Sequence, residues 1–206
     1  MDAGRFYLSK LDSAAGVDEA GRGCLAGPVV AAAVILPFPC PVSGLDDSKK
    51  LSSGKRSLLA DQVKRQARAW SIGLSWPSEI DQINILQATL KAMARAVKGL
   101  KIIPDQILVD GNQKIPLEIP QKTIPGGDSL VPSISAASIL AKTFRDGLMV
   151  SLEKKYPGYG FAGHKGYGTR EHLRAIKSLG PSPVHRMTFK GVRVVTREKM
   201  LWLTKG

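Results

Sequence analysis

The 206-residue sequence is poor in cysteine, in acidic side chains and in long apolar runs. Its two cysteines, Cys24 and Cys40, form no Cys-x-x-Cys pair, so a disulfide-rich class is excluded and a zinc or redox site is disfavoured. The longest apolar run, from Val29 to Leu36, is too short to span a membrane. No basic start followed by an apolar stretch opens the chain, so no secretory signal is predicted. We therefore expect a cytoplasmic protein with reduced thiols and no membrane partner.

The scarcity of acidic residues gives the chain a strongly basic charge. Seventeen acidic side chains face 30 lysines and arginines, so the net charge is +13. From Lys142 onward there are 14 basic and 4 acidic residues, and this stretch carries +10 of the total. A basic surface kept only for solubility is one reading. The regional excess favours a polyanionic partner, nucleic acid above all.

The order of the expected elements indicates an α/β fold. Hydrophobic residues make up 43% of the chain, which is enough for one substantial core. We predict strands over residues 14–20, 27–36, 69–75, 106–110 and 121–124, and helices over 55–68, 83–97, 135–152 and 169–179. This order predicts a mixed β-sheet flanked by helices. Because no linker interrupts the chain, we expect one domain over 1–206, with a core at about 12–155 and a basic helical part at about 156–206.

Two of these helices are predicted from apolar stripes. One stripe consists of Ile83, Leu86, Leu90, Met93 and Val97, with Ser78 as the expected N-cap of its helix. The other consists of Leu140, Phe144, Leu148 and Leu152. We expect the first stripe to face the core.

Carboxylates stand where two predicted strands end. Asp18 and Glu19 come just before the turn Gly21-Arg22-Gly23, Asp110 ends another strand, and Asp128 follows two glycines. A single strand-terminal aspartate is more often a turn former, but clustered carboxylates repel one another unless a cation is bound. Carboxylates suit Mg²⁺ or Mn²⁺, while glycines beside an arginine let backbone N–H groups approach a phosphate or sugar. Together these features point to metal-dependent phosphodiester chemistry.

Seven ordered segments carry a resemblance to a known family. They are Gly16-Val-Asp-Glu-Ala-Gly-Arg-Gly23, Asp47-Ser-Lys-Lys-Leu51, Ile107-Leu-Val-Asp-Gly111, Gly127-Asp128, Ser135-Ala-Ala-Ser-Ile-Leu-Ala-Lys142, His164-Lys-Gly-Tyr-Gly-Thr169 and Pro183-Val-His-Arg186. In these segments the chain resembles bacterial ribonuclease HII, a type 2 ribonuclease H. The resemblance implies a ribonuclease H-like mixed sheet with a helical basic C-terminal extension. No role follows from it for residues 190–206.

The resemblance also implies an activity. The implied activity is that of a metal-dependent endonuclease that hydrolyses the RNA strand of RNA–DNA hybrids. It also cuts 5′ to ribonucleotides embedded in duplex DNA, leaving 3′-hydroxyl and 5′-phosphate ends. The implied partners are these two nucleic acids, for a monomeric protein, with a replication or transcription protein left open as a further partner.

Residue roles follow from the same resemblance. The implied ligands of Mn²⁺ or Mg²⁺, in a two-metal mechanism, are Asp18, Glu19, Asp110 and Asp128. Gly21, Arg22 and Gly23 fall on the turn that recognises the ribose 2′-hydroxyl, and Tyr167 on the residue that packs against the sugar on the DNA side. The implied contacts with the substrate backbone are Lys49, Lys50, Ser138 and Lys142. Without the resemblance, the shared helix face of Ser138 and Lys142 would indicate solvent exposure.

Three alternatives are weighed against this reading. A non-catalytic nucleic-acid-binding domain would be expected to lack one of the four acids. A nuclease or resolvase specific for DNA would need no reader of a 2′-hydroxyl. The histidines His164, His172 and His185 could suggest acid–base catalysis, but we expect a surface or helix-capping role for each.

Overall fold

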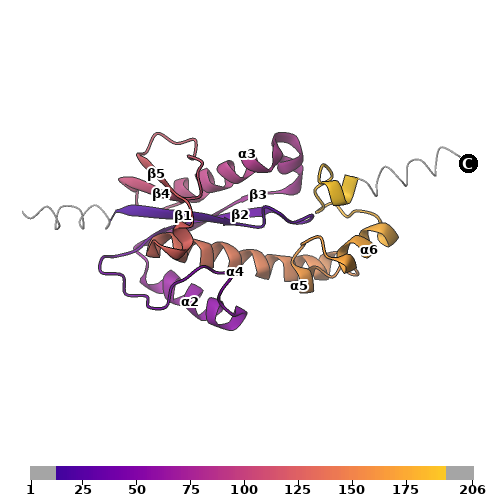
Figure 1. Cartoon of the computed structure of the whole chain (residues 1–206), viewed down its shortest axis with the longest axis horizontal. Helices are drawn as coiled ribbons and strands as arrows, with labels where there is room; N and C mark the ends of the chain where they lie inside the picture. The colour runs from indigo at the N-terminus through magenta and orange to yellow at the C-terminus, as the bar shows by residue number, and fades with distance from the viewer. Residues whose placement is uncertain (1–12, 194–206) are drawn as a thin grey trace, which may run out of the picture. The chain divides into compact units, whose positions relative to one another are not determined.

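The computed structural model describes residues 13–193, whose elements are labelled in Figure 1. The strands are β1 (Ala14–Ala20), β2 (Val29–Ile35), β3 (Ala69–Ser75), β4 (Gln106–Asp110) and β5 (Gln121–Ile124). The helices are α2 (Ser53–Gln66), α3 (Pro77–Lys98), the 3₁₀ turn η1 (Gly127–Ser129), α4 (Pro132–Lys155), α5 (Phe161–His164) and α6 (Arg170–Leu179). None of the helices in this part of the chain is long and apolar enough to cross a membrane.

The five strands form one mixed sheet in the order β3-β2-β1-β4-β5. Strand β1 pairs antiparallel with β2, with Val17 opposite Ala33, and parallel with β4, with Val17 opposite Val109. Strand β4 pairs parallel with β5. The predicted α/β class with a mixed sheet is therefore confirmed.

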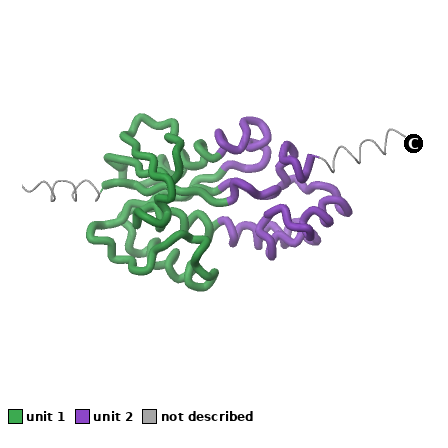
Figure 2. Tube along the Cα trace, in the orientation of Figure 1, with its two compact units in different colours: residues 1–20, 30–74, 89–144 green, residues 21–29, 75–88, 145–206 purple. Residues whose placement is uncertain are grey.

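The chain divides into two compact units, coloured separately in Figure 2. Unit 1 contains residues 1–20, 30–74 and 89–144, and unit 2 contains residues 21–29, 75–88 and 145–206. Unit 1 holds nearly all of the sheet, whereas unit 2 holds the Gly21-Arg22-Gly23 turn, α5 and α6. The expected division into a core and a part beginning near residue 156 stays a prediction.

Helices cover both faces of the sheet within unit 1. Ile72 and Leu74 of β3 pack against a buried cluster that draws on α2, α4 and β2. Gly73, which lies between them, faces α3 instead, because a side-chain carbon there would lie 2.1 Å from the carbonyl oxygen of Ala92. Alternate residues of a strand face opposite sides of a sheet. Helices α2 and α4 therefore lie on one side and α3 on the other, as Figure 1 shows.

A glycine in β1 brings helix α4 close to the sheet. A side-chain carbon at Gly16 would lie 2.2 Å from the backbone of Ser133, a distance that no real side chain tolerates. The helix continues with small buried residues such as Ala136, Ala137 and Ala141. This close approach places the first turns of α4 beside the strand that carries Asp18.

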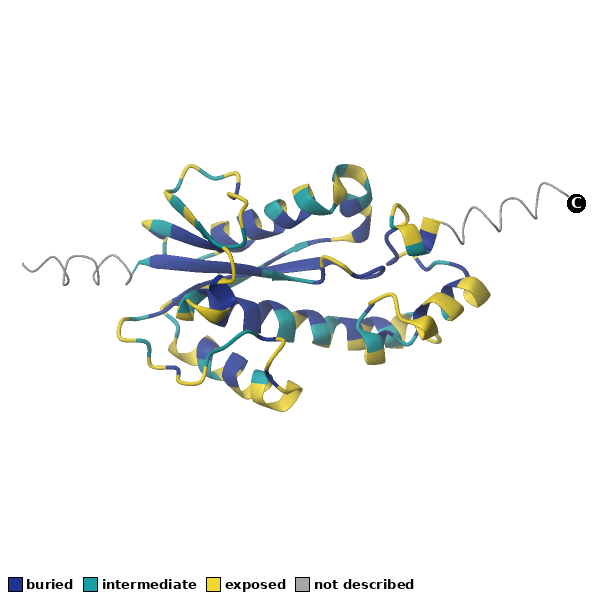
Figure 3. Ribbon diagram, viewed as in Figure 1, coloured by how far each residue is buried: buried dark blue, intermediate teal, exposed yellow. Residues whose placement is uncertain are grey.

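Unit 2 has its own apolar core, made by parts of the chain that are far apart in sequence. One cluster joins Ala26, Met149, Leu152, Tyr159, Phe161 and Val184. The rings of Tyr159 and Phe161 stack with centroids 5.3 Å apart. Helix α6 follows Thr169, whose side chain accepts a hydrogen bond from the backbone N–H of His172 as its N-cap. The blue segments of Figure 3 trace the buried residues of both units.

The long helices show two features that the local sequence pattern does not give, and one of them overturns the expected N-cap at Ser78. Helix α3 begins at Pro77, so Ser78 lies inside its first turn rather than capping it, and proline is favoured at that first position. Phe144 is 45% exposed, whereas the neighbouring Arg145 is only 1% exposed. Leu140 and Leu152 of the same stripe are buried, each in a different apolar cluster. Phe144 lies between them along the helix and belongs to neither cluster.

Candidate active site

Three aspartates from separate segments meet in unit 1. Asp18 lies near the end of β1, Asp110 ends β4 and Asp128 lies in η1. One carboxylate oxygen from each can be chosen so that all three lie within 4.8 Å of one another. Strands β1 and β4 run parallel, which brings their carboxyl ends to the same edge of the sheet. The N–H of Gly127 donates to Asp110 Oδ1 at 2.8 Å and so ties η1 to that edge.

The carboxylates of this cluster lie close enough to repel one another. Burial raises the pKa of Asp18 well above its ordinary value, and the charges of Glu19 and Asp110 raise it further. Burial also raises the pKa of Asp128, as do the charges of Asp47 and Asp110. Bringing such carboxylates together costs free energy unless a cation neutralises them. The donor set, all hard carboxylate oxygens, fits Mg²⁺ or Mn²⁺.

Glu19 is adjacent to Asp18 but does not belong to the three-oxygen cluster. Successive residues of β1 face opposite sides of the sheet. Asp18 accepts a hydrogen bond from Ser138 of α4, whereas Ala15, on the same side of the strand as Glu19, packs against Ile35. The charge of Glu19 acts on Asp18 all the same, and its role as a metal ligand stays a prediction.

The loop before α2 brings a lysine to the aspartates. Lys49 Nζ lies 3.7 Å from Asp128 Oδ2 and 3.8 Å from Asp47 Oδ1. Partial burial acts to lower the pKa of Lys49, but the nearby carboxylates raise it overall. Lys50 pairs instead with Asp46, at 3.2 Å. Asp47 was not among the residues predicted for the site. Its only signal was its place at the head of Asp47-Ser-Lys-Lys-Leu51.

Ser138 is a buried neighbour of the cluster rather than an exposed residue. Its hydroxyl hydrogen-bonds Asp18 and lies 3.0 Å from the hydroxyl of Ser48, and both serines are 3% exposed. The pair therefore links the loop before α2 to helix α4 behind Asp18. Lys142, one turn further along α4, is partly buried. The predicted contacts of Ser138 and Lys142 with the substrate backbone stay predictions.

In unit 2, the Gly21-Arg22-Gly23 turn combines a tight backbone with an open face. Gly21 has φ of 93°, and a side-chain carbon there would lie 2.0 Å from Nε of Arg145, so only glycine fits. Arg22 and Gly23 are exposed. Beyond its two chain neighbours, a side-chain carbon at Gly23 would meet no atom within 4 Å. The turn therefore presents its backbone to open space.

Two buried arginines, which the sequence did not single out, lie beneath this turn. Arg186 is 0% exposed and Arg145 is 1% exposed. Arg186 donates to the carbonyls of Gly21, Arg22 and Gly27. Arg145 donates to those of Ala26, Pro28 and Lys165. Burial lowers the pKa of Arg186 to about 10, so it remains charged at neutral pH. The only signal in the sequence was the place of each arginine in or beside a family segment.

Tyr167 lies on a loop that is fastened to the same part of unit 2. The carbonyl of Gly166 accepts a hydrogen bond from the N–H of Leu25 at 2.8 Å. The carbonyl of Tyr167 lies 2.9 Å from Nδ1 of His172, and its hydroxyl hydrogen-bonds the side chain of Cys24. The Tyr167 side chain is still 44% exposed. The loop therefore holds a partly exposed aromatic ring on a fixed backbone.

The expectation of a surface or helix-capping role is wrong for two of the three histidines. His172 is 0% exposed and His185 is 1% exposed, and their Nε2 atoms lie 3.0 Å apart. The N–H of Ser182 donates to Nδ1 of His185, so the proton of that ring is on Nε2 and points at His172. His172 then accepts with Nε2 and donates with Nδ1. Apolar neighbours such as Phe161 surround the pair, which the sequence around either histidine does not reveal.

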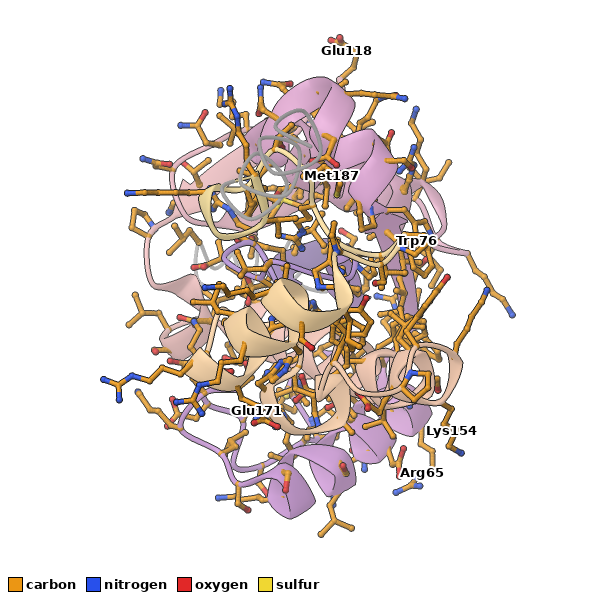
Figure 4. The ribbon with its side chains drawn as sticks, turned by 90° about the vertical axis from the view of Figure 1, so that its right-hand side faces the viewer. Arg65, Trp76, Glu118, Lys154, Glu171 and Met187 are labelled. Atoms are coloured by element: carbon orange, nitrogen blue, oxygen red, sulfur yellow. The ribbon has the colours of Figure 1, made fainter. Side chains whose placement is uncertain are left out.

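Exposed basic side chains gather on the outer elements of unit 2. They include Lys154 and Lys155 at the end of α4 and Arg170, Arg174 and Lys177 on α6. Lys154 points away from the ribbon in Figure 4. The predicted basic extension thus has solvent-facing charges among its described residues. Residues 194–206 lie outside the described part of the chain.

Comparison with known proteins gives consistent matches. A family model of ribonuclease HII matches residues 15–192. A ribonuclease HII of Nitratidesulfovibrio vulgaris is 57% identical over 190 residues, which cover 87% of this chain and 86% of that protein. The crystal structure of ribonuclease H2 from Pyrococcus horikoshii has a TM-score of 0.75 and 27% identity, covering 90% of this chain and 97% of that one. The ribonuclease HII of Archaeoglobus fulgidus in its complex with PCNA has a TM-score of 0.70 and 27% identity, covering 88% and 96%.

Proposed function

This chain belongs to the ribonuclease HII family, and on that premise we propose a specific reaction for it. As a ribonuclease H it is an endonuclease that cleaves RNA in RNA–DNA hybrids. We propose that it also cuts on the 5′ side of single ribonucleotides embedded in duplex DNA, leaving 3′-hydroxyl and 5′-phosphate ends. The observation that carries the proposal is the group of three aspartates with oxygens within 4.8 Å, on a chain that continues from Glu19 through Ala20 into the Gly21-Arg22-Gly23 turn.

The carboxylates of Asp18, Asp110 and Asp128, with Glu19 beside them, would hold divalent metal ions. A bound Mg²⁺ or Mn²⁺ supplies activation of water and neutralisation of the leaving oxygen. The protein contributes the placement of these acids, since Gly127 holds Asp110 and Ser138 holds Asp18. Lys49, which is exposed and close to Asp128, would neutralise a phosphate of the substrate backbone. For Lys50 and Lys142 we keep the same role on the resemblance alone.

Recognition of the sugar would fall to unit 2. Backbone N–H groups of the exposed residues Arg22 and Gly23 suit a 2′-hydroxyl, the group that distinguishes RNA from DNA. The ring of Tyr167 offers a surface on which the following deoxyribose can pack without regard to sequence. Arg22 and the basic side chains of α6 would neutralise phosphates without reading bases.

The test uses a DNA duplex that carries one ribonucleotide, a uniform RNA–DNA hybrid and an all-DNA duplex. With Mg²⁺ or Mn²⁺ we expect cleavage of the first two substrates and none of the third, and EDTA should abolish both reactions. Sequencing gels with phosphatase-treated and untreated products should show a 5′-phosphate on the ribonucleotide. Cleavage on the 3′ side of the ribonucleotide, or equal cleavage of all-DNA duplex, would refute the proposal.

For the assembly we propose a monomer that works with a replication protein. The relative from Archaeoglobus fulgidus was solved in a complex with PCNA, which supports a replication partner for this chain. Light scattering after size exclusion tests the monomer. Affinity purification of the tagged chain from its own cells, with a sliding clamp among the recovered proteins, tests the partner.

A further inference from the structure

The buried guanidinium of Arg186 gathers three carbonyls of a single loop in unit 2. Nη1 donates to the carbonyl of Arg22 at 2.7 Å, and Nη2 donates to that of Gly21 at 2.7 Å. Nε and Nη2 both donate to the carbonyl of Gly27, at 3.1 and 3.0 Å. Among residues 13–193, this guanidinium donates hydrogen bonds only to carbonyl oxygens and forms no ion pair, and its carbon lies 5.0 Å from the centroid of the Phe189 ring. The backbone carbonyls of the loop therefore stabilise the buried positive charge of Arg186.

Because the peptide bond is planar, these contacts also set the direction in which the backbone N–H groups of the loop point. In a trans peptide the C=O and the following N–H point in opposite directions across a rigid plane. With the carbonyl of Gly21 turned toward Arg186, the N–H of Arg22 must point away from it. Likewise, the carbonyl of Arg22 points toward Arg186, so the N–H of Gly23 points away from it.

The other side of these two peptides is open. Arg22 and Gly23 are exposed although Gly21 and Cys24 on either side are buried. Apart from Gly23 and its two chain neighbours, no part of the protein lies within 4 Å of the position that a side-chain carbon of Gly23 would take. The N–H groups of Arg22 and Gly23 therefore lie on the side of the turn away from Arg186, in two exposed residues.

We propose that Arg186 is a positioning residue for ribose recognition, which aims the N–H groups of Arg22 and Gly23 at the sugar from behind. This inference rests on the proposed ribose-reading role of the Gly21-Arg22-Gly23 turn. A planar fork of five donors can bind three carbonyls at once, whereas the ammonium of lysine is a point charge on a flexible stem. The cation also polarises the peptides it binds, which strengthens their outward N–H groups as donors.

Arg145 is a matched control within the same unit. It is equally buried and also donates only to carbonyls, but to those of Ala26, Pro28 and Lys165. It binds neither carbonyl of the two peptides in question. Arg145→Lys and Arg186→Lys should therefore lower the stability of the protein alike. Arg186→Lys should change the recognition of ribose more than Arg145→Lys, because the Arg145 guanidinium packs against Gly21 but binds neither of the two carbonyls.

The experiment compares two affinities measured on each preparation by fluorescence anisotropy, in EDTA so that no turnover occurs. One ligand is duplex DNA with a single ribonucleotide, and the other is the same duplex with no ribonucleotide. The quantity of interest is the ratio of the two affinities, which does not depend on the folded fraction of the sample. We expect Arg186→Lys to lower this ratio by about tenfold, the effect of losing about one hydrogen bond to the hydroxyl.

The possible outcomes distinguish a failure of this inference from a failure of the proposed ribose recognition on which it rests. A wild-type ratio of one would overturn the proposed ribose reading, and the inference with it. A wild-type preference that Arg186→Lys leaves unchanged, or that Arg145→Lys lowers equally, would overturn the inference alone. If Arg186→Lys does not fold, Arg186→Gln, which keeps two donors on its amide, supplies the same comparison.

Discussion

At the residue scale, Asp110 can be neutralised with little disturbance of its surroundings. The amide oxygen of Asp110→Asn can still accept the hydrogen bond from Gly127. Loss of an outer-shell partner of a metal ligand already costs about 10–100-fold, so we expect loss of the ligand itself to reduce turnover by at least about 100-fold. Binding of the hybrid should persist, because negative charge near the phosphates is removed. We expect the same result for Asp18→Asn. Full activity of Asp110→Asn would show that Asp110 does not belong to the proposed site.

The same substitution should stabilise the metal-free protein. It removes one of the charges that raise the pKa of Asp18, and so relieves repulsion inside the folded state. If that repulsion costs about 1 kcal/mol, the melting temperature in EDTA should rise by about 2–4 °C. Thermal unfolding of wild type and Asp110→Asn in EDTA measures the difference. A lower melting temperature for the variant would contradict the electrostatic argument.

Tyr167 is the second residue whose role can be isolated. Its backbone is held at both neighbouring peptides, so Tyr167→Ala should remove the ring without moving the loop. Loss of an aromatic packing surface is worth about 1–3 kcal/mol. Turnover of the single-ribonucleotide duplex should fall accordingly, and that of the uniform hybrid should fall less. Tyr167→Phe, which loses only the hydroxyl, should keep the preference. Equal losses of Tyr167→Ala on both substrates would make the ring a structural feature.

At the scale of the elements, the approach of α4 to β1 depends on Gly16. In Gly16→Ala the new carbon would meet the backbone of Ser133, which cannot move aside as a flexible side chain could. We expect a loss of about 1–3 kcal/mol in the free energy of unfolding. The control is Gly54→Ala in the first turn of α2, where nothing lies within 4 Å and alanine should add up to about 0.5–1 kcal/mol. Urea unfolding should therefore show opposite signs, and two shifts of the same sign would refute the packing argument.

The buried histidine pair makes the stability of unit 2 depend on pH. Burial lowers the pKa of His172, and it lowers that of His185 to about 4. The unfolded chain therefore binds more protons than the folded chain between about pH 6.5 and 4, so stability must fall as the pH falls through this window. Urea unfolding at several pH values should show this slope, and His172→Gln should reduce it. A variant with the wild-type slope would show that other groups cause the acid sensitivity.

At the scale of the whole molecule, the +13 charge governs the strength of nucleic-acid binding. Two of the basic residues from Lys142 onward, Arg145 and Arg186, are buried and cannot contact phosphates. If about five exposed side chains do, the logarithm of the affinity should fall with the logarithm of salt concentration with a slope of about −4 to −5.

Anisotropy titrations across salt concentrations test this dependence. Arg174→Ala on α6 should make the slope shallower by about 1. Arg65→Ala on α2, an exposed arginine of unit 1, should change it less. Affinity that stays flat with salt would refute the electrostatic account.

Local sequence patterns were sufficient for most of the elements. Strands β1, β3, β4 and β5 have the predicted bounds, because a short apolar run ended by a charge or turn is a local signal. Helix α6 and its N-cap at Thr169 also follow from local sequence. Ser78 and Phe144 show the limit of such patterns. Which residue begins a helix, and which face is buried, depend on the segments that pack against it.

The sequence by itself determined the chemistry available to this protein. It supplied hard carboxylates at strand ends, the glycines of the Gly21-Arg22-Gly23 turn and a surplus of positive charge. The tertiary structure decided which of these residues meet. Asp18, Asp110 and Asp128 converge because β1 and β4 run parallel, a pairing between residues that are some ninety positions apart. Arg186 looks like a surface residue in sequence, and it is buried because the carbonyls of a distant loop solvate its charge in place of water.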